Sequence, residues 1–208
     1  MLQIKIQEKS YSNKPILQDI QLSISQPGLY GIVGANGAGK TTFFKCLSSL
    51  EAFEGEILYQ GSPLSSGQVA FIPTEPYLYD HLTVGEFYSF YRKLLGIKTV
   101  EKYTFEIDEN TLIKRLSTGM RKKVYYNAVL QKPYTLYIFD EPFNGLDIAS
   151  VIHIKKLLHS LAQTHIVLVA SHLLESLQAC VKIYLLQHLH FQAFAPEQIP
   201  FIESILIE

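Results

Sequence analysis

Residues 34–41 most constrain the fold, because they read Gly-Ala-Asn-Gly-Ala-Gly-Lys-Thr and fit the spacing GxxxxGK[ST]. A short apolar run at residues 29–33 precedes them, and a helix is expected from about residue 39 to residue 50. Strand, glycine loop and helix therefore follow one another in the order that a phosphate-binding loop requires. The motif predicts an α/β protein that binds a nucleotide.

Each residue type in this loop has a physical role. Glycines let the backbone curl so that successive N–H groups point at one anion, and the first turn of the following helix adds its free N–H groups. Lys40 supplies a positive charge to the outer phosphates, and the Thr41 hydroxyl is placed to ligate Mg²⁺. The loop residues that we assign to nucleotide binding are Gly34, Asn36, Gly37, Ala38, Gly39, Lys40, Thr41 and Thr42.

Composition limits the possible partners of the chain. Its 208 residues carry a formal net charge of −1, which gives no overall attraction to nucleic acid or to an anionic membrane. Cys46 and Cys180 lack metal-site spacing, and the N-terminus lacks a secretory signal pattern. No apolar run approaches the roughly 18–20 residues of a membrane span. We therefore expect a cytoplasmic protein, which would serve a membrane only through a partner.

Strand and helix patterns alternate along the chain, which favours an α/β core with a mostly parallel sheet. The first two expected strands alternate polar and apolar residues, as half-buried antiparallel strands do, and they predict an N-terminal antiparallel β subdomain. Strands are expected at residues 2–6, 20–24, 29–33, 55–59, 69–72, 136–139, 166–170, 181–186 and 191–194.

A helical pattern interrupts the strands between about residues 83 and 132, where apolar residues recur at spacings of three and four. We expect one domain over residues 1–208, with a core lobe at about 1–73 and 133–208 and a helical subdomain at about 74–132. The expected helical faces carry Val84, Phe87, Phe90, Tyr91 and Leu94, then Leu112, Leu116, Met120, Val124 and Ala128.

Two adjacent carboxylates, Asp140 and Glu141, end the buried strand at residues 136–139. Ligands of open α/β sheets bind at the carboxyl ends of the strands, so these side chains are expected near the phosphates. Asp140 would hold the Mg²⁺ ion through its water shell, and Glu141 would take a proton from the attacking water. An ordinary acidic cap of a strand is the alternative interpretation.

Two further polar positions follow core elements. Ser117 precedes an apolar-periodic run as a helix N-cap would, and Gly119 allows close approach of another group. His172 follows the strand at residues 166–170, so it is a candidate contact of the γ-phosphate. A common capped helix start and an ordinary loop histidine are the alternatives.

The order of these motifs resembles the nucleotide-binding subunits of ABC transporters over nearly the whole chain. Residues 34–41 look like the Walker A loop, residues 116–120 like a divergent LSGGQ signature, and residues 136–141 like Walker B with the catalytic glutamate. Residues 144–147 look like the D-loop, and His172 looks like the switch histidine. The resemblance implies a P-loop NTPase core that binds ATP and Mg²⁺, with Tyr11 at the position of the aromatic residue that stacks on adenine.

The sequence departs from the family pattern at two places. Thr74 stands where the family has a glutamine after the Phe71-Ile72-Pro73 segment, so it is a further candidate for the metal contact. The signature has Thr118 and Met120 where Gly and Gln are usual. Ser117 and Gly119 are the signature residues whose roles carry over.

The resemblance also implies partners. Two copies of the chain, as a homodimer, would each cover the other's ATP with Ser117 and Gly119, so hydrolysis would depend on association. A multi-span membrane permease, encoded as a separate chain, would hold the protein at the inner face of the cell membrane and be driven by it. The alternative is a soluble ABC ATPase that acts on nucleic acid, ribosomes or cofactor assembly.

Two surface features bear on this choice. The aromatic loop at residues 76–82 suits a socket for a helix of the permease, although Tyr77 and Tyr79 would also suit packing between the lobes. Arg121, Lys122 and Lys123 form the one basic cluster, which we interpret as a solvated helix face or a feature of the signature helix. No nucleic-acid partner is expected.

Overall fold

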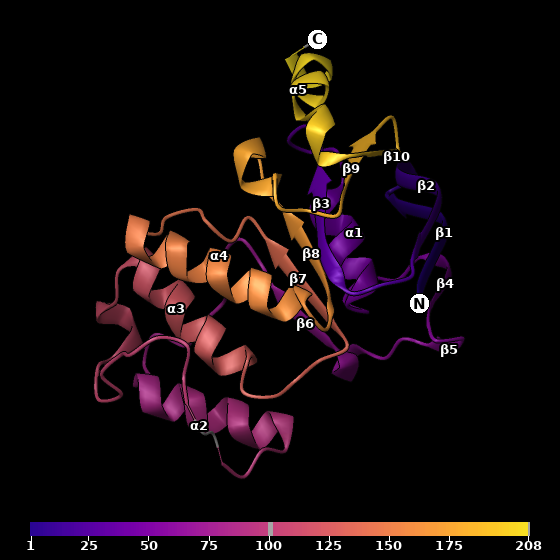
Figure 1. The fold of residues 1–208 in the computed structure, drawn as a ribbon. Coiled ribbons are helices and arrows are strands. Elements are labelled where there is room, and N and C mark those ends of the chain that lie inside the picture. Colours follow the sequence, from indigo (N-terminus) through magenta and orange to yellow (C-terminus); the bar gives the residue numbers. More distant parts are fainter. Residues whose placement is uncertain (100–101, 208) are drawn as a thin grey trace.

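The structure is a computed structural model that describes residues 1–99 and 102–207, and its centre is a six-stranded sheet (Figure 1). The strand order is β10-β9-β3-β8-β7-β6. All pairs are parallel except that of β10 with β9. The strands are β3 (Gly28–Val33), β6 (Val69–Ile72), β7 (Leu136–Asp140), β8 (Ile166–Ala170), β9 (Lys182–Gln187) and β10 (His190–Phe194).

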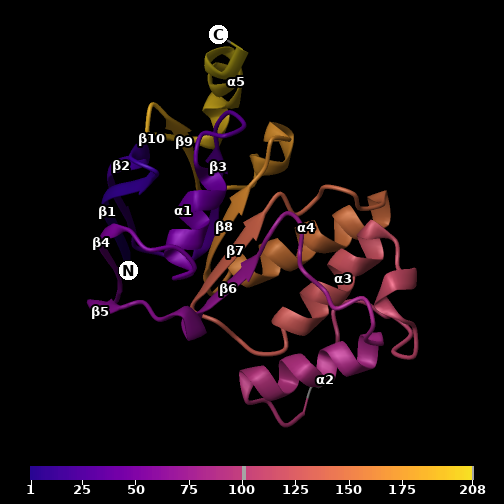
Figure 2. The same ribbon diagram turned by 180° about the vertical axis from the view of Figure 1, so that it is seen from behind.

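A second, antiparallel sheet covers one side of the core. It contains β1 (Leu2–Tyr11), β2 (Lys14–Ile24), β4 (Glu54–Tyr59) and β5 (Ser62–Pro63) in the order β2-β1-β4-β5. Helix α1 (Lys40–Leu47) lies between the two sheets (Figure 2). The buried cluster at this interface includes Leu2, Ile4, Ile6, Phe43, Phe44, Ile138 and Leu168. The expected fold class, a mostly parallel sheet with an N-terminal antiparallel sheet and a helical insertion, is confirmed.

Helices cover the other face of the six-stranded sheet. Helix α4 (Ile148–Ala162) crosses it between β7 and β8, and α5 (Ile199–Ile207) follows β10 at the end of the chain. Strands β7 and β8 are buried throughout, as strands covered on both faces must be. The buried cluster on this side includes Tyr126, Phe139, Ile154, Leu158, Val167, Ile183 and Ile202.

The helical insertion lies between β6 and β7 in the sequence and contains α2 (Val84–Leu95) and α3 (Thr118–Val129). These two helices pack on each other. Thr83 and Glu86 form a capping box at the start of α2, and the Ser117 hydroxyl accepts the N–H of Met120 at the start of α3. The core of this part contains Val84, Phe87, Tyr88, Ile113, Val124 and Ala128.

The expected helical faces were wrong at several positions. Leu112 and Leu116 lie outside any α-helix, since Leu112 bridges Thr83 and a 3₁₀ turn, Ile113–Arg115, precedes the cap at Ser117. The spacing of four simply continues across this turn, so periodicity alone did not reveal it. Three further positions that were expected on the buried faces are exposed instead: Phe90, Leu94 and Met120.

Across residues 1–99 and 102–207, we find no helix with the length and apolar character that crossing a membrane requires.

A substitution of Ile138 tests how much the buried side chains of β7 contribute to stability. Ile138 is fully buried in β7, so Ile138→Ala should leave a cavity and lower the free energy of unfolding by about 2–5 kcal/mol, measured by urea denaturation. Ile152→Ala on the exposed side of α4 is the matched control, with an expected change within about 0.5 kcal/mol. Equal losses in the two variants would contradict the burial of β7 between the two layers.

Candidate nucleotide site

The glycine loop connects the buried strand β3 to α1 by a path that only glycine follows easily. Gly39 directly precedes α1 with a φ of 110°, and a Cβ there would lie 2.9 Å from Cγ2 of Ile16. A Cβ on Gly34 would lie 2.6 Å from the carbonyl oxygen of Leu186. These contacts are too close for real Cβ atoms, so both positions need glycine for space as well as for conformation.

Lys40, the first residue of α1, turns back over the loop. Its Nζ donates to the carbonyl oxygens of Gly34, at 2.7 Å, and Ala35, at 3.1 Å. Burial lowers the pKa of Lys40, and the negative charges of Glu141 and Asp140 oppose this shift. The ammonium group is therefore held inside the loop whose N–H groups would surround a phosphate.

Thr41 joins the loop to the end of β7. Its hydroxyl donates to Oδ2 of the buried Asp140 at 2.7 Å. This pair brings a hydroxyl and a carboxylate oxygen together, and hard oxygen ligands are those that Mg²⁺ prefers. The donor set at this point fits a magnesium ion.

Glu141 has an unusual backbone and two side-chain contacts. Its φ of 50° lies in the left-handed region, which a residue with a Cβ adopts only at an energetic cost. Its N–H donates to the carbonyl oxygen of Ala170 at the end of β8. Oε2 lies 2.8 Å from Nδ1 of His172 and accepts the His172 backbone N–H at 3.4 Å. The two residues assigned to catalysis are thus in direct contact.

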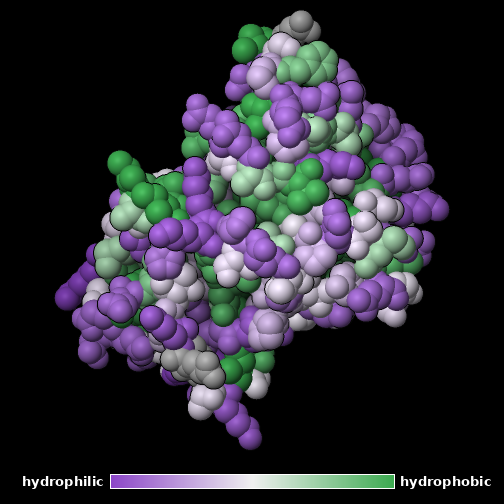
Figure 3. Space-filling view, viewed as in Figure 1, coloured by the Kyte–Doolittle hydropathy of each residue, from purple (hydrophilic) through white to green (hydrophobic). Residues whose placement is uncertain are grey.

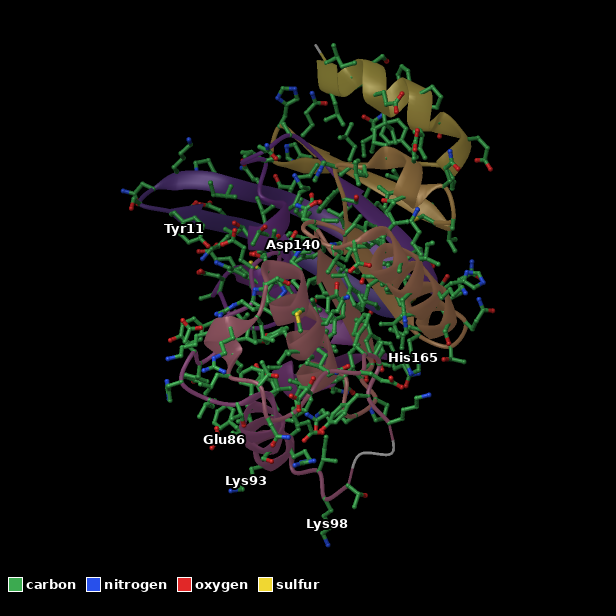
Figure 4. The ribbon with its side chains drawn as sticks, turned by 90° about the vertical axis from the view of Figure 1, so that its left-hand side faces the viewer. Tyr11, Glu86, Lys93, Lys98, Asp140 and His165 are labelled. Carbon is green, nitrogen blue, oxygen red and sulfur yellow. The ribbon has the colours of Figure 1, made fainter. Side chains whose placement is uncertain are left out.

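The loop, Asp140, Glu141 and His172 line one cavity of about 460 Å³. Thr74, the residue in place of the family's glutamine, is also part of the lining. Figure 4 shows Asp140 near the middle of the molecule, well away from Glu86 and Lys93 on α2. The full lining is Ile16, Asn36, Gly37, Gly39, Lys40, Thr41, Thr42, Thr74, Asp140, Glu141, Asn144 and His172.

Tyr11 lies outside this lining, at the end of β1, and interacts with Thr42, which belongs to it. Nζ of Lys9 is 4.4 Å from the centre of the Tyr11 ring and 3.0 Å from Oε2 of Glu51. Burial and a hydrogen bond to Glu51 raise the pKa of the Tyr11 phenol. One face of the ring therefore rests on a paired cation.

Comparison with known proteins identifies the family. The family profile described as ABC transporter matches residues 17–144. The chain is 31% identical over 204 residues to YhaQ, an uncharacterized ABC transporter ATP-binding protein of Bacillus subtilis (strain 168), with 90% of this chain and 68% of YhaQ covered. The chain belongs to the ABC transporter ATP-binding family. It is also 34% identical over 165 residues to the SkfA peptide export ATP-binding protein SkfE of the same organism, with 72% of this chain and 69% of SkfE covered.

Solved structures agree on the fold of this ABC protein. A structure described as the ATP binding subunit of an ABC transporter matches with a TM-score of 0.84, at 24% sequence identity, and covers 99% of this chain and 94% of the other. At this level of identity the match establishes the fold alone.

The segment that resembles the ABC signature lies apart from the cavity. Neither Ser117 nor Gly119 belongs to the lining, although both lie at the start of α3. Gly119 instead packs against the D-loop, where a Cβ would lie 2.8 Å from the carbonyl oxygen of Gly145. The structure thus brings together the residues of the glycine loop, Asp140, Glu141 and His172, but not the signature residues.

Sequence reasoning missed three residues at or near the site. Ile16 and Asn144 line the cavity, and Lys122 donates to the backbone of the turn that carries Glu141. The sequence does indicate a place near the site for Asn144, because this residue opens the segment that resembles the D-loop. The sequence does not mark Ile16 or Lys122 as part of the site. An apolar residue in a strand is more often a core residue, and a lysine on a helix is more often a surface residue.

Gly119 tests the contact between the signature segment and the D-loop. Gly119→Ala should force the Gly145 backbone to shift and lower the free energy of unfolding by about 1–3 kcal/mol, as overpacking does. Gly67→Ala is the control, because a Cβ there meets no atom within 4 Å and the expected change is within about 0.5 kcal/mol. Urea denaturation of both variants measures the difference, and equal stabilities would contradict this contact.

Proposed function

We propose that this protein is the ATP-hydrolysing subunit of an ABC transporter and drives a separate membrane-spanning permease. The observation that carries the proposal is the single cavity in which the Thr41–Asp140 hydrogen bond lies beside the Glu141–His172 pair. A phosphate-binding loop, a magnesium ligand set and a carboxylate that can accept a proton are then within reach of one nucleotide.

In this proposal the loop binds the phosphates of ATP through its backbone N–H groups, and Lys40 neutralises their charge. Thr41 and, through water, Asp140 hold Mg²⁺, which would stabilise the charge that develops on the phosphate oxygens. Thr74 lines the same cavity and offers a further oxygen ligand, directly or through water. Tyr11 stacks on adenine from the side of β1.

Glu141 is proposed as the general base. The oxygen of a water molecule attacks the γ-phosphorus, the bond to the leaving ADP oxygen breaks, and Glu141 accepts the proton of the water. The contact with His172 orients the carboxylate through Nδ1, so that Nε2 is the ring nitrogen left to contact the γ-phosphate.

A second copy of the chain is proposed to complete the site. Ser117 and Gly119 lie outside the cavity of their own chain, so their proposed role requires the cavity of another. Apolar side chains are exposed beside three of the motifs that resemble the family: Met120 next to the signature, Ile148 after the D-loop and Leu173 after the switch histidine. Figure 3 shows apolar side chains gathered over the start of α4, where Ile148 lies. Two copies associated head to tail would bury these side chains.

The permease is proposed to dock on an aromatic patch formed by Tyr77, Tyr79 and Phe90. All three side chains are exposed, and Tyr79 lies 5.4 Å from Tyr77 and 5.7 Å from Phe90 between ring centroids. Rigid aromatic side chains of this kind are the usual anchors of protein interfaces. Through such a partner the protein would be peripheral on the cytoplasmic face of the membrane. SkfE, one of the relatives, is named for peptide export.

The basic cluster gives little support to a nucleic-acid partner. Arg121 pairs with Asp80, Lys123 pairs with Asp147, and Lys122 is buried. Cations that are already paired or buried release few counterions on contact with a phosphate backbone. Strong, salt-dependent stimulation of ATP hydrolysis by RNA or DNA would favour the soluble alternative.

Glu141→Gln tests the catalytic proposal. The amide keeps the size of the side chain but cannot accept a proton, so turnover should fall by about 10²-fold or more while ATP affinity stays within about twofold. Steady-state ATPase assays and nucleotide titration measure the two quantities. Size-exclusion chromatography with ATP should show the variant as a dimer. Lys156→Met on the surface of α4 should turn over ATP at the wild-type rate, whereas unchanged turnover in Glu141→Gln would reject the role of Glu141.

Tyr79→Ala tests the permease surface. With the copurified multi-span protein reconstituted in vesicles, this variant should lose about tenfold or more of the stimulation of ATP hydrolysis by the permease, as loss of a hot-spot aromatic would cause. Its ATP affinity should not change, because Tyr79 does not line the nucleotide cavity. Full stimulation would place the permease elsewhere.

A further inference from the structure

Three consecutive basic residues at the start of α3 contact three different segments. Nη1 of Arg121 lies 2.6 Å from Oδ1 of Asp80, in the aromatic loop. Lys123 reaches Oδ2 of Asp147, which caps α4, at 3.0 Å. Both ion pairs are partly exposed, and such pairs contribute little to stability. Lys122, between them, points inward instead.

Lys122 is buried, with 5% of its surface exposed, and contacts the turn that follows Asp140. Its Nζ donates to the carbonyl oxygen of Asn144 at 2.7 Å and to that of Glu141 at 3.3 Å. A buried lysine is costly unless its N–H groups are paired, so these two bonds account for its position.

Other residues on the same side of α3 contact the same turn. Tyr126, four residues after Lys122, donates from its hydroxyl to the carbonyl oxygen of Pro142 at 3.3 Å. Gly119, three residues before Lys122, packs on the backbone of Gly145. Since positions three and four apart share one side of a helix, this side of α3 contacts residues 141–145 along their length.

The turn needs these outside contacts, because its own hydrogen bonds are long. Asn144 N–H lies 3.4 Å from the carbonyl oxygen of Glu141, and Leu146 N–H lies 3.4 Å from that of Phe143. Glu141 also has the left-handed φ of 50°. A residue keeps such a conformation only where its surroundings hold it there.

We propose that Lys122 is a positioning residue for Glu141: its two hydrogen bonds hold the turn in the conformation that aims the Glu141 carboxylate at the nucleotide cavity. The inference rests on the proposed role of Glu141 in hydrolysis. It also makes α3 the physical connection, within one chain, between the signature segment at its start and the proposed catalytic base.

The electrostatic surroundings of Lys122 agree with this role. Burial lowers the pKa of the ammonium group, and the negative charges of Glu141, Glu75 and Asp140 oppose the shift. The charge of Lys122 therefore also lies close to the carboxylates of the site. A misplacement of a catalytic group by about 1 Å can cost about 10²-fold in rate, so a small shift of the turn would be measurable.

The experiment compares Lys122→Met with Lys122→Arg, and Lys156→Met serves as a control for the loss of one lysine. Methionine keeps an unbranched side chain but cannot donate, whereas arginine keeps the charge and the donors. Three quantities are measured on the whole chain: the turnover number for ATP, the affinity for a fluorescent ATP analogue, and the melting temperature. Hydrogen exchange of the peptide at residues 141–147, without nucleotide, reports the turn directly.

Lys122→Met should lower the turnover number by about tenfold or more, leave nucleotide affinity within about twofold, and speed exchange in the turn. Lys122→Arg should recover a large part of the turnover, and Lys156→Met should match the wild type in every measurement. This separation of turnover from affinity, with rescue by arginine, is what a merely structural lysine would not produce.

Two results would overturn the inference. One is wild-type turnover in Lys122→Met while Glu141→Gln is inactive. The other is a parallel loss of melting temperature, affinity and turnover in Lys122→Met that arginine does not rescue, which would make Lys122 a residue of the fold alone. Full turnover in Glu141→Gln would instead reject the proposed function, and the inference with it.

Discussion

Ala170, the last residue of β8, pairs in register with Ile32 of β3 on one side and with Asp140 of β7 on the other. This parallel alignment ends three strands at one level, and each strand is followed at once by a segment of the site. The glycine loop follows β3, Glu141 follows β7, and His172 follows β8 with one residue between. The Thr41–Asp140 and Glu141–His172 contacts are therefore consequences of strand register rather than of any local motif.

Helix α3 adds a second constraint from outside the sheet. It belongs to the helical insertion through Val124 and Ala128, which pack against α2, and it contacts the turn after β7 through Lys122 and Tyr126. Arg121 also ties it to the aromatic loop. A rigid-body movement of the insertion relative to the sheet would thus displace the signature segment, the aromatic loop and the Glu141 backbone together. In a rigid-body movement a helix shifts as a unit, because its packed side chains resist continuous deformation.

The sequence predicted the features that depend on neighbouring residues. The spacing of Gly34, Gly39 and Lys40 is a local signal, and so are the buried run of β7 and the cap at Ser117. The sequence did not reveal what tertiary packing decides. The apolar spacing persists across the turn before Ser117 and so predicts helix there. For Lys122 the sequence leaves open a solvated helix face or a feature of the signature helix, because its partners are backbone carbonyls, which no pattern of side chains marks.

The departure from the family pattern at Thr74 leaves an oxygen-bearing residue in the lining of the cavity. Thr74 comes two residues after the end of β6, which pairs in parallel with β7, so it lines the cavity from the neighbouring strand end. A threonine has one oxygen on a short side chain where a glutamine would carry a longer amide, so a metal contact of Thr74 would be made closer to the strand or through water. The Thr41–Asp140 hydrogen bond already brings two side-chain oxygens together. In the proposed site, Thr74 would therefore add to an arrangement that these two residues establish. On this proposal, the residue at position 74 would orient a ligand shell whose place the register of β7 and β8 sets.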